Sequence, residues 1–259
     1  MLVFTESEIA AFVQQYMLPF CRISGLFLAM PVIGTRLVPA RSRVVMAFVT
    51  TLMVVPLLPP LPLIPLLSAQ FAFWTVQELV IGAAVGFLFQ VVFQVFVLAG
   101  QFIAMKLGLG FASMNDPSNG VQTTVLSQFY LMLVTLMFIS INGHLVLIEL
   151  LIQSFQTLPP GSTVFSAAKS HDVASMGAWL FASALIISLP ILTGLLVVNI
   201  AFGVMSRAAP QLNIFAVGFP FTLICGMVMI WIGLNSFQVN FDQVIAEGFY
   251  AVHDLLETK

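Results

Sequence analysis

Few side chains in this sequence are placed for covalent chemistry. The two cysteines, Cys21 and Cys225, lie far apart in apolar runs, which favours buried free thiols over a disulfide or a metal pair. The histidines show no ligand spacing (His144, His171, His253). No serine or cysteine stands beside a base, and no phosphate-cradling glycine loop occurs. We therefore expect no catalytic residue, no enzymatic activity, no metal and no cofactor.

Two charged residues, Arg22 and Glu149, stand inside long apolar segments. An ionisable side chain at membrane depth is costly, so it usually faces a protein interior or an aqueous path. Arg22 has a second option, because a long side chain can extend to the membrane surface. A transporter or channel for small solutes would use such charges, and it remains one function class. A subunit of a larger membrane assembly is the other.

A long loop, Lys106 to Gln122, interrupts the apolar helices in the middle of the chain. Its turn-favouring residues are Gly108, Gly110, Asp116, Pro117 and Gly120. It also carries apolar residues, among them Phe111 and Met114. At membrane depth, non-helical backbone persists only where protein buries it or where it lines a water-filled cavity. The local residues fit a pore-blocking loop, but they favour an ordinary connection facing water.

Two sets of polar residues recur along expected helices. By the 3.6-residue period, one set shares a narrow face of residues 79–105: Gln90, Gln94 and Gln101. A second set recurs every seven residues of an expected continuous helix over 123–153: Gln128, Thr135, Asn142 and Glu149. Lipid solvates neither set cheaply, so each should face a subunit, a neighbouring helix or a pore. For the second set, hydrogen bonding inside a bundle is slightly favoured.

The composition is that of an integral membrane protein. Of 259 residues, 60% are hydrophobic and 7% are charged, whereas a soluble domain carries about 25% charge. The mean hydropathy is +1.10. A net charge of -2 gives no reason to expect a nucleic-acid partner.

Six apolar segments must position these residues: 9–33, 44–77, 79–105, 123–153, 174–205 and 212–241. Five prolines between residues 56 and 65 should end the second after a helix of about 15 residues, leaving an irregular linker that packs on other protein. The third would span roughly 40 Å, more than a ~30 Å hydrocarbon core. Within it, Gly82 and Gly86 predict the close approach of another helix.

The sequence predicts a helical hairpin in the C-terminal part of the chain, after a boundary near residue 173. Pro190 and Pro220 predict kinks, and Gly226 with Gly233 predicts a close helix contact. Residues 242–259 form an amphipathic tail that we expect at the membrane interface or against a partner.

Charge predicts the orientation. Basic residues concentrate in alternate loops that share one side: Arg36, Arg41, Arg43, Lys106 and Arg207. The opposite loops offer only Lys169. Arginine- and lysine-rich turns stay cytoplasmic, so six crossings would place both termini on the outside.

Several motifs also carry a resemblance. They run Gly108-Leu-Gly-Phe-Ala-Ser113, Asp116-Pro117, Gly120-Val-Gln122, Val125-Leu-Ser-Gln-Phe-Tyr130 and Asn142-Gly-His-Leu145. Together with the region from Pro31 to Arg43 and the turn from Arg207 to Asn213, they resemble the FliR family of flagellar biosynthesis proteins. The resemblance covers nearly the whole chain. Injectisome homologues share the architecture, but the sequence is closer to the flagellar branch.

The resemblance implies a fold and an assembly. FliR proteins are subunits of the flagellar type III secretion export gate, together with several copies each of FliP and FliQ, and they contact FlhB. The implied fold is an all-α membrane protein of long kinked helical hairpins in a helical hetero-oligomer. Residues 1–173 would be FliP-like, and residues 174–259 would be FliQ-like. Much of the complex would lie on the periplasmic side of the inner membrane, so six conventional crossings would not apply.

The resemblance also assigns a role to the central loop. The family has a plug loop in its closed pore, which maps onto about residues 106–122. Exported unfolded flagellar subunits would pass through that pore, and Phe111 with Met114 would supply an apolar seal at rest. The glycines would let the loop swing aside. Because the assembly sits in a membrane, lipid is the remaining expected partner.

Overall fold

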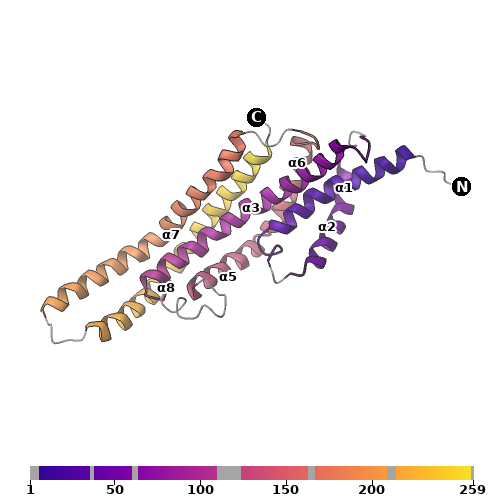
Figure 1. Cartoon of the computed structure of the whole chain (residues 1–259). Coiled ribbons are helices and arrows are strands. Elements are labelled where there is room, and N and C mark those ends of the chain that lie inside the picture. Colours follow the sequence, from indigo (N-terminus) through magenta and orange to yellow (C-terminus); the bar gives the residue numbers. More distant parts are fainter. Residues whose placement is uncertain are drawn as a thin grey trace. The chain divides into compact units, whose positions relative to one another are not determined.

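The computed structural model describes residues 6–35, 38–59, 64–109, 124–162, 167–208 and 214–257. Every regular element in these ranges is a helix (Figure 1). In chain order they are α1 (Glu6–Ala29), α2 (Ala40–Val54), the 3-10 helix η1 (Val55–Leu57), α3 (Ala69–Lys106), α5 (Val125–Ser140), α6 (Gly143–Thr157), α7 (Ala167–Ala208) and α8 (Ile214–Leu256). The expected all-α fold class is confirmed.

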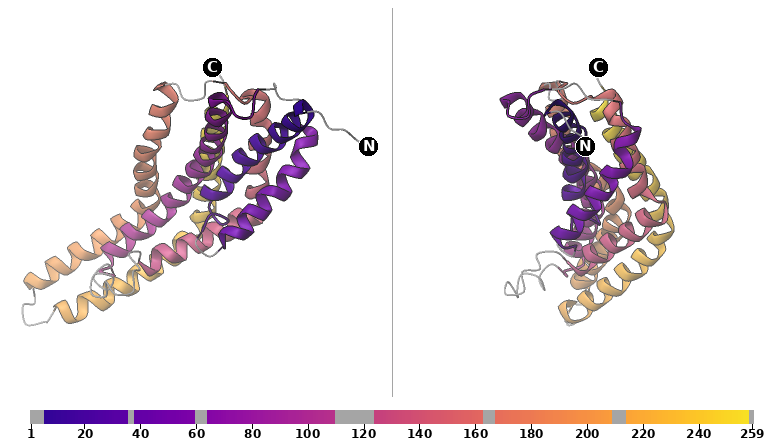
Figure 2. Two further views of the ribbon diagram at one scale, coloured as in Figure 1. Left: turned by 45° about the vertical axis from the view of Figure 1, so that its right-hand side comes forward. Right: turned by 90° about the vertical axis from the view of Figure 1, so that its right-hand side faces the viewer.

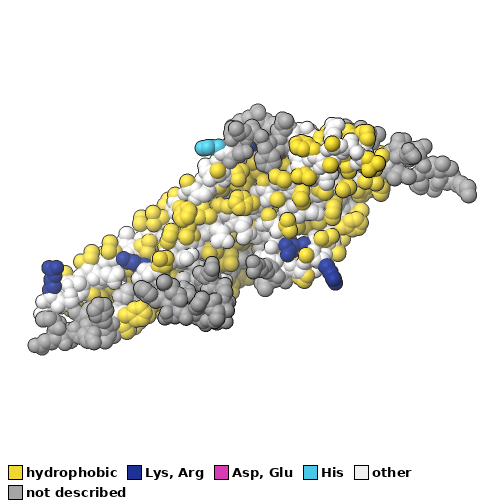
Figure 3. Space-filling view, in the orientation of Figure 1, with side chains coloured by type: hydrophobic (Ala, Val, Ile, Leu, Met, Phe, Trp, Pro, Cys, Tyr) yellow, Lys and Arg dark blue, Asp and Glu magenta, His cyan; other side chains and the backbone are white. Residues whose placement is uncertain are grey.

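Four helical stretches of the described chain are long and apolar enough to cross a membrane: Ala40–Leu57, Ala69–Lys106, His171–Ala208 and Val217–Leu256. A fifth candidate is the broken pair α5 and α6. Apolar side chains also cover much of the surface that Figure 3 shows. The protein is therefore an integral membrane protein, with fewer candidate spans than the six apolar segments indicated.

Helix α3 is longer than the charge-free run that predicted it. It begins at Ala69, where the Ser68 hydroxyl accepts a hydrogen bond from the Phe71 amide at 3.1 Å, and it extends over 38 residues. A serine at this position satisfies an amide that has no partner inside the helix. The helix ends at Lys106, and Gly108 follows with φ +79°. The expected end of the helix at the glycine-rich loop is confirmed.

The predicted continuous helix over residues 123–153 is wrong. Helix α5 ends at Ser140, and α6 begins at Gly143. Asn142 between them is left-handed, with φ 55° and ψ 29°, a conformation that asparagine tolerates better than most residues. A Cβ at Gly143 would overlap the ring of Phe138, so the small residue lets the chain turn tightly over that ring. The seven-residue repeat therefore does not lie on one uninterrupted helix.

The C-terminal helices also differ from their expected bounds. Helix α7 continues through Pro190 and α8 through Pro220, and Figure 2 shows α7 bending partway along its length. The predicted separate tail is wrong, because residues 242–256 are the last turns of α8. Its apolar side chains are buried in the chain itself: Val244, Ile245, Val252, Leu255 and Leu256.

The chain forms two compact units, and each combines distant parts of the sequence. Unit 1 comprises residues 1–91, 138–175 and 248–259, and unit 2 comprises residues 92–137 and 176–247. In unit 2, the Phe96 ring lies 5.4 Å from that of Phe237 and 6.3 Å from that of Phe241. In unit 1, the Lys169 ammonium donates to the carbonyls of Leu255 and Glu257, capping the end of α8. The proposed division at residue 173 rests on the resemblance and stays a prediction.

Candidate functional site

The centre of unit 1 is a close crossing of α1 and α3. A Cβ at Gly82 would overlap the carbonyl oxygen of Arg22, and one at Gly25 would overlap that of Leu79. One at Gly86 would stand 2.8 Å from the Met30 amide nitrogen. Small residues let two helix backbones approach in this way. The close-packing role predicted for Gly82 and Gly86 is confirmed, and α1 is the helix that they contact.

This crossing encloses an ion pair between Arg22 of α1 and Glu78 of α3. The Nε of Arg22 donates to Oε2 of Glu78 at 2.6 Å, and Nη2 donates to Oε1 at 2.8 Å. Both side chains are 0% exposed. Two parallel hydrogen bonds between guanidinium and carboxylate form one of the strongest charged contacts in proteins. The pair is therefore a fixed joint between the two helices.

Helix α6 and the residue that follows it supply the remaining partners of Arg22. Its Nη1 donates to the Ser154 hydroxyl at 2.9 Å, and Nη2 also donates to the carbonyl of Leu158 at 2.8 Å. The Phe155 ring lies under the guanidinium, with its centroid 4.1 Å from Cζ, a cation–π contact. Since a buried charge is tolerated only when it is paired and hydrogen-bonded, this ring of partners explains how Arg22 is accommodated. One side chain thus joins α1, α3 and α6.

These contacts decide between the protein interior and the membrane surface as the position of the Arg22 side chain, and they show that sequence reasoning overlooked Glu78. Arg22 faces the protein interior and does not extend to the membrane surface. Glu149, its suggested partner in a transport path, is exposed on α6, where it accepts from Gln153 at 3.3 Å. Sequence reasoning missed Glu78 because it lies just before the charge-free run. It is the only acidic residue between positions 9 and 115, and that isolation was the available signal.

Two glutamines fasten the loops of unit 1 near this joint. Gln77, the neighbour of Glu78, donates to the carbonyl of Ser162, beyond the end of α6. Gln14 of α1 donates to the carbonyl of Ile64 and accepts from its amide at 3.2 Å. Ile64 lies near the C-terminal end of the proline-rich linker, so hydrogen bonds from α1 of the same chain hold this part of the linker.

The described edge of the central loop lies in unit 2. Lys106 is exposed, whereas the Leu107 side chain is buried against Gly226. The close helix contact predicted at Gly226 and Gly233 is thus not seen as such, because Gly226 meets the turn after α3 and Gly233 has only an ordinary contact with Ile191. A Cβ at Gly108 would stand 2.8 Å from the ring of Phe219, in addition to the positive φ. The other plug residues lie outside the described part of the chain: Gly110, Phe111, Met114, Asp116, Pro117, Gly120 and Gln122.

An apolar cavity of about 520 Å³ lies beside the described start of this loop and the start of α5. Its lining comes from the turn after α3, from α5 and from α8: Leu107, Leu109, Val125, Leu126, Phe129, Leu223, Met227 and Ile230. No described polar side chain lines it, so it offers room for apolar groups only. The plug assignment remains a prediction.

The polar residues that sequence reasoning placed in stripes lie mainly on the surface of the chain. Gln90 and Gln94 are exposed on α3, and Gln101 is partly exposed. On α5, Gln128 is exposed, and the Thr135 hydroxyl donates to the Leu131 carbonyl at 2.7 Å. Asn142 is exposed at the break before α6, which carries Glu149. Except for Gln101 and Thr135, which are half-buried, these side chains are exposed within the chain.

The basic turns are differently placed. Arg41 is exposed in the first turn of α2, and Arg207 is exposed in the last turn of α7. Arg43 is partly buried, and its Nε has no hydrogen-bond partner in the described structure. Arg36 lies outside the described residues. Their cytoplasmic position stays a prediction.

Fold and site together define an all-helical integral membrane protein in which a buried ion pair joins three helices. Residues 13–248 match the model of the family described as bacterial export proteins, family 1, and the chain belongs to that family.

Curated relatives agree over almost the full length. The chain is 34% identical over 256 residues to the flagellar biosynthetic protein FliR of Pectobacterium carotovorum subsp. carotovorum, covering 99% of this chain and 98% of the relative. It is 36% identical over 228 residues to the protein of that name from Escherichia coli (strain K12), covering 88% of this chain and 87% of the relative. The Bacillus subtilis (strain 168) protein of that name is 26% identical over 244 residues, covering 93% and 94%.

Proposed function

We propose that this chain is a subunit of the flagellar type III export gate and helps form the closed pore through which unfolded flagellar proteins leave the cell. The observation that carries the proposal is the family match over residues 13–248, together with relatives named FliR from Escherichia coli and Bacillus subtilis. Since the relatives are flagellar, the flagellar branch is favoured over the injectisome branch. The role is conduction and sealing, with no enzymatic step.

The exposed helices support assembly with other proteins. Helix α7 has 42 residues and α8 has 43, so each is about 63 Å long, twice a ~30 Å hydrocarbon core. In an apolar 18-residue stretch of each helix, 22% of the residues of α7 and 11% of those of α8 are buried within this chain, against 67% for α3. Lipid cannot cover the whole of such apolar helices. We infer that FliP and FliQ homologues cover the rest of these helices and that FlhB contacts the assembly. The assembly would sit in the inner membrane at the flagellar basal body and extend to the periplasmic side of that membrane.

The test is the mass and composition of the native complex. The chain is tagged at its C-terminus, extracted in mild detergent, and analysed with what co-purifies. We expect a particle far heavier than the 28.2 kDa chain, containing several FliP-like and FliQ-like subunits. A monomer or homodimer without such subunits would contradict the proposal.

Within this function we propose that residues 106–122 plug the resting pore. An apolar seal excludes ions because stripping water from an ion is costly. We expect Phe111→Ser with Met114→Ser to raise the ion permeability of cells, measured as sodium or proton leak, without loss of the assembled gate. Phe111→Leu with Met114→Leu is the matched control and should stay tight. Equal leak in both variants, or none in either, would reject the seal.

We also propose that the glutamine stripe of α3 faces a subunit or the pore. Changing Gln90, Gln94 and Gln101 together to leucine should abolish most swimming and flagellar protein export, because the polar partners across the contact lose their hydrogen bonds. Gln70→Leu is the control, since that exposed residue lies on roughly the opposite face of the helix by the 3.6-residue period. Full motility of the triple variant would refute this placement.

A further inference from the structure

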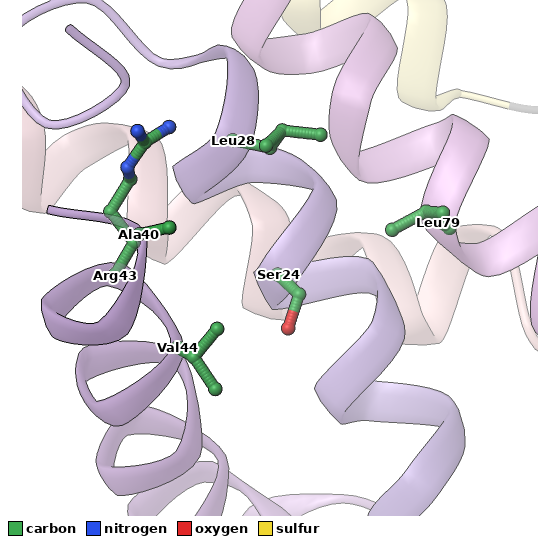
Figure 4. A pocket seen from close by; sticks show the side chains of 6 residues that line it. All are labelled: Ser24, Leu28, Ala40, Arg43, Val44 and Leu79. Carbon is green, nitrogen blue, oxygen red and sulfur yellow. The ribbon is translucent and has the colours of Figure 1, made fainter. Parts of the chain in front are cut away.

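A small groove lies between α1 and α2 in unit 1, apart from the Arg22 joint. It has a volume of about 160 Å³ and is lined by Ser24, Leu28, Ala40, Arg43, Val44 and Leu79. Figure 4 shows Ser24 and Val44 on its two sides and the guanidinium of Arg43 extending toward one end. The groove is therefore apolar along its walls and cationic at one end.

Two polar atoms in this groove have no partner in the described structure. They are the Ser24 hydroxyl oxygen and the Nε of Arg43, and both are buried. A buried donor without an acceptor costs free energy, and native structures rarely leave one unexplained. The Nε of Arg43 can only donate and the Ser24 hydroxyl can donate as well as accept, so one partner with acceptor oxygens would satisfy both.

The surrounding charge favours an anion. Arg41 and Arg43 stand in the first turn of α2, which contains no acidic residue. Glu78, which directly precedes the groove-lining Leu79, is fully engaged by Arg22. The amide groups at the start of α2 add partial positive charge, because a helix N-terminus has unpaired N–H groups.

The surface next to the groove favours lipid over a free ion. Helix α2 presents a continuous exposed apolar face: Val45, Phe48, Val49, Leu52 and Met53. The same helix, with η1, is one of the candidate membrane spans. A ligand here meets an anion-binding end and an apolar wall that continues into the membrane.

We propose that this groove binds one anionic phospholipid. Its phosphate accepts hydrogen bonds from Arg43, and an ester oxygen accepts from the Ser24 hydroxyl. An acyl chain lies against Leu28, Val44 and Leu79 and continues along the outer face of α2. The inference does not depend on the proposed export function.

The test is lipid binding to the full-length chain, purified in mild detergent within whatever complex it forms, measured by native mass spectrometry with phosphatidylglycerol. We expect one lipid per chain to survive stripping conditions. Arg43→Gln should weaken its binding roughly tenfold, the effect of losing a charged hydrogen bond. Arg41→Gln, which removes a neighbouring exposed charge outside the groove, should weaken binding less than threefold.

A second variant separates a built site from general charge attraction. Ala40→Leu fills the groove without changing charge and should also displace the lipid, whereas Arg43→Lys should retain most binding. Phosphatidylcholine and inorganic phosphate should each bind weakly. The proposal would be overturned if Arg43→Gln and Arg41→Gln weakened lipid binding equally, or if Ala40→Leu left it unchanged. It would also be overturned if phosphatidylcholine or phosphate bound as well as phosphatidylglycerol, or if a helix of a partner protein were cross-linked into the groove. Unchanged thermal unfolding of the variants shows that the chain remains folded.

Discussion

Glu78→Gln is expected to destabilise the purified chain by about 3–5 kcal/mol, the usual cost of removing one partner from a buried ion pair. The substitution keeps the shape of the side chain but leaves the Arg22 guanidinium charged, fully buried and without its carboxylate. Because Arg22 also contacts α6, the loss should loosen α1, α3 and α6 together. Thermal unfolding and protease resistance of the purified chain in detergent would measure this loss of stability.

Two further variants make this prediction specific to the pair. Arg22→Met with Glu78→Met removes both charges and should recover much of the lost stability, since apolar replacement of a whole buried pair is often neutral. Glu149→Gln changes an exposed carboxylate and should alter stability by less than about 1 kcal/mol. If Glu78→Gln is as mild as Glu149→Gln, the joint does not brace the unit.

Gly82→Ala is expected to cost about 3 kcal/mol, at the upper end of overpacking effects. The new Cβ would overlap the Arg22 carbonyl and stand 2.8 Å from its carbonyl carbon, and neither is the end of a flexible side chain. Helices α1 and α3 must therefore separate, which also strains the Arg22–Glu78 contact. Reduced melting temperature and reduced yield of the assembled complex would report it.

Two glycines of α7 provide matched controls. Gly177 and Gly203 have no atom within 4 Å of an added Cβ. Alanine at either position should be neutral or stabilising by up to ~1 kcal/mol in the isolated chain, because alanine favours helix more than glycine does. Similar losses at Gly82 and at these positions would mean that helix propensity, and not the α1–α3 crossing, decides the outcome.

The sequence by itself determined the class of fold, the positions of most helices and the family. Long apolar runs have one stable backbone state in lipid, which is the helix, so their existence follows from composition. Gly82 and Gly86 indicated a close crossing because small side chains at that spacing leave a flat helix face. The motifs near Gly108 and Asn142 carried the resemblance, which the family match confirms.

Only the tertiary structure decided which elements meet. Periodicity places Arg22 on a helix but does not identify its partner, and Glu78 and Ser154 are 56 and 132 residues away in the chain. The break at Asn142 was missed because one left-handed residue leaves no periodic signal, while the Phe138 ring over Gly143 stabilises the turn. Likewise, residues 242–256 have the amphipathic pattern of a surface tail, and their burial depends on the helices that cover them. Contacts between distant segments depend on the packing of the whole chain, which local pattern does not encode.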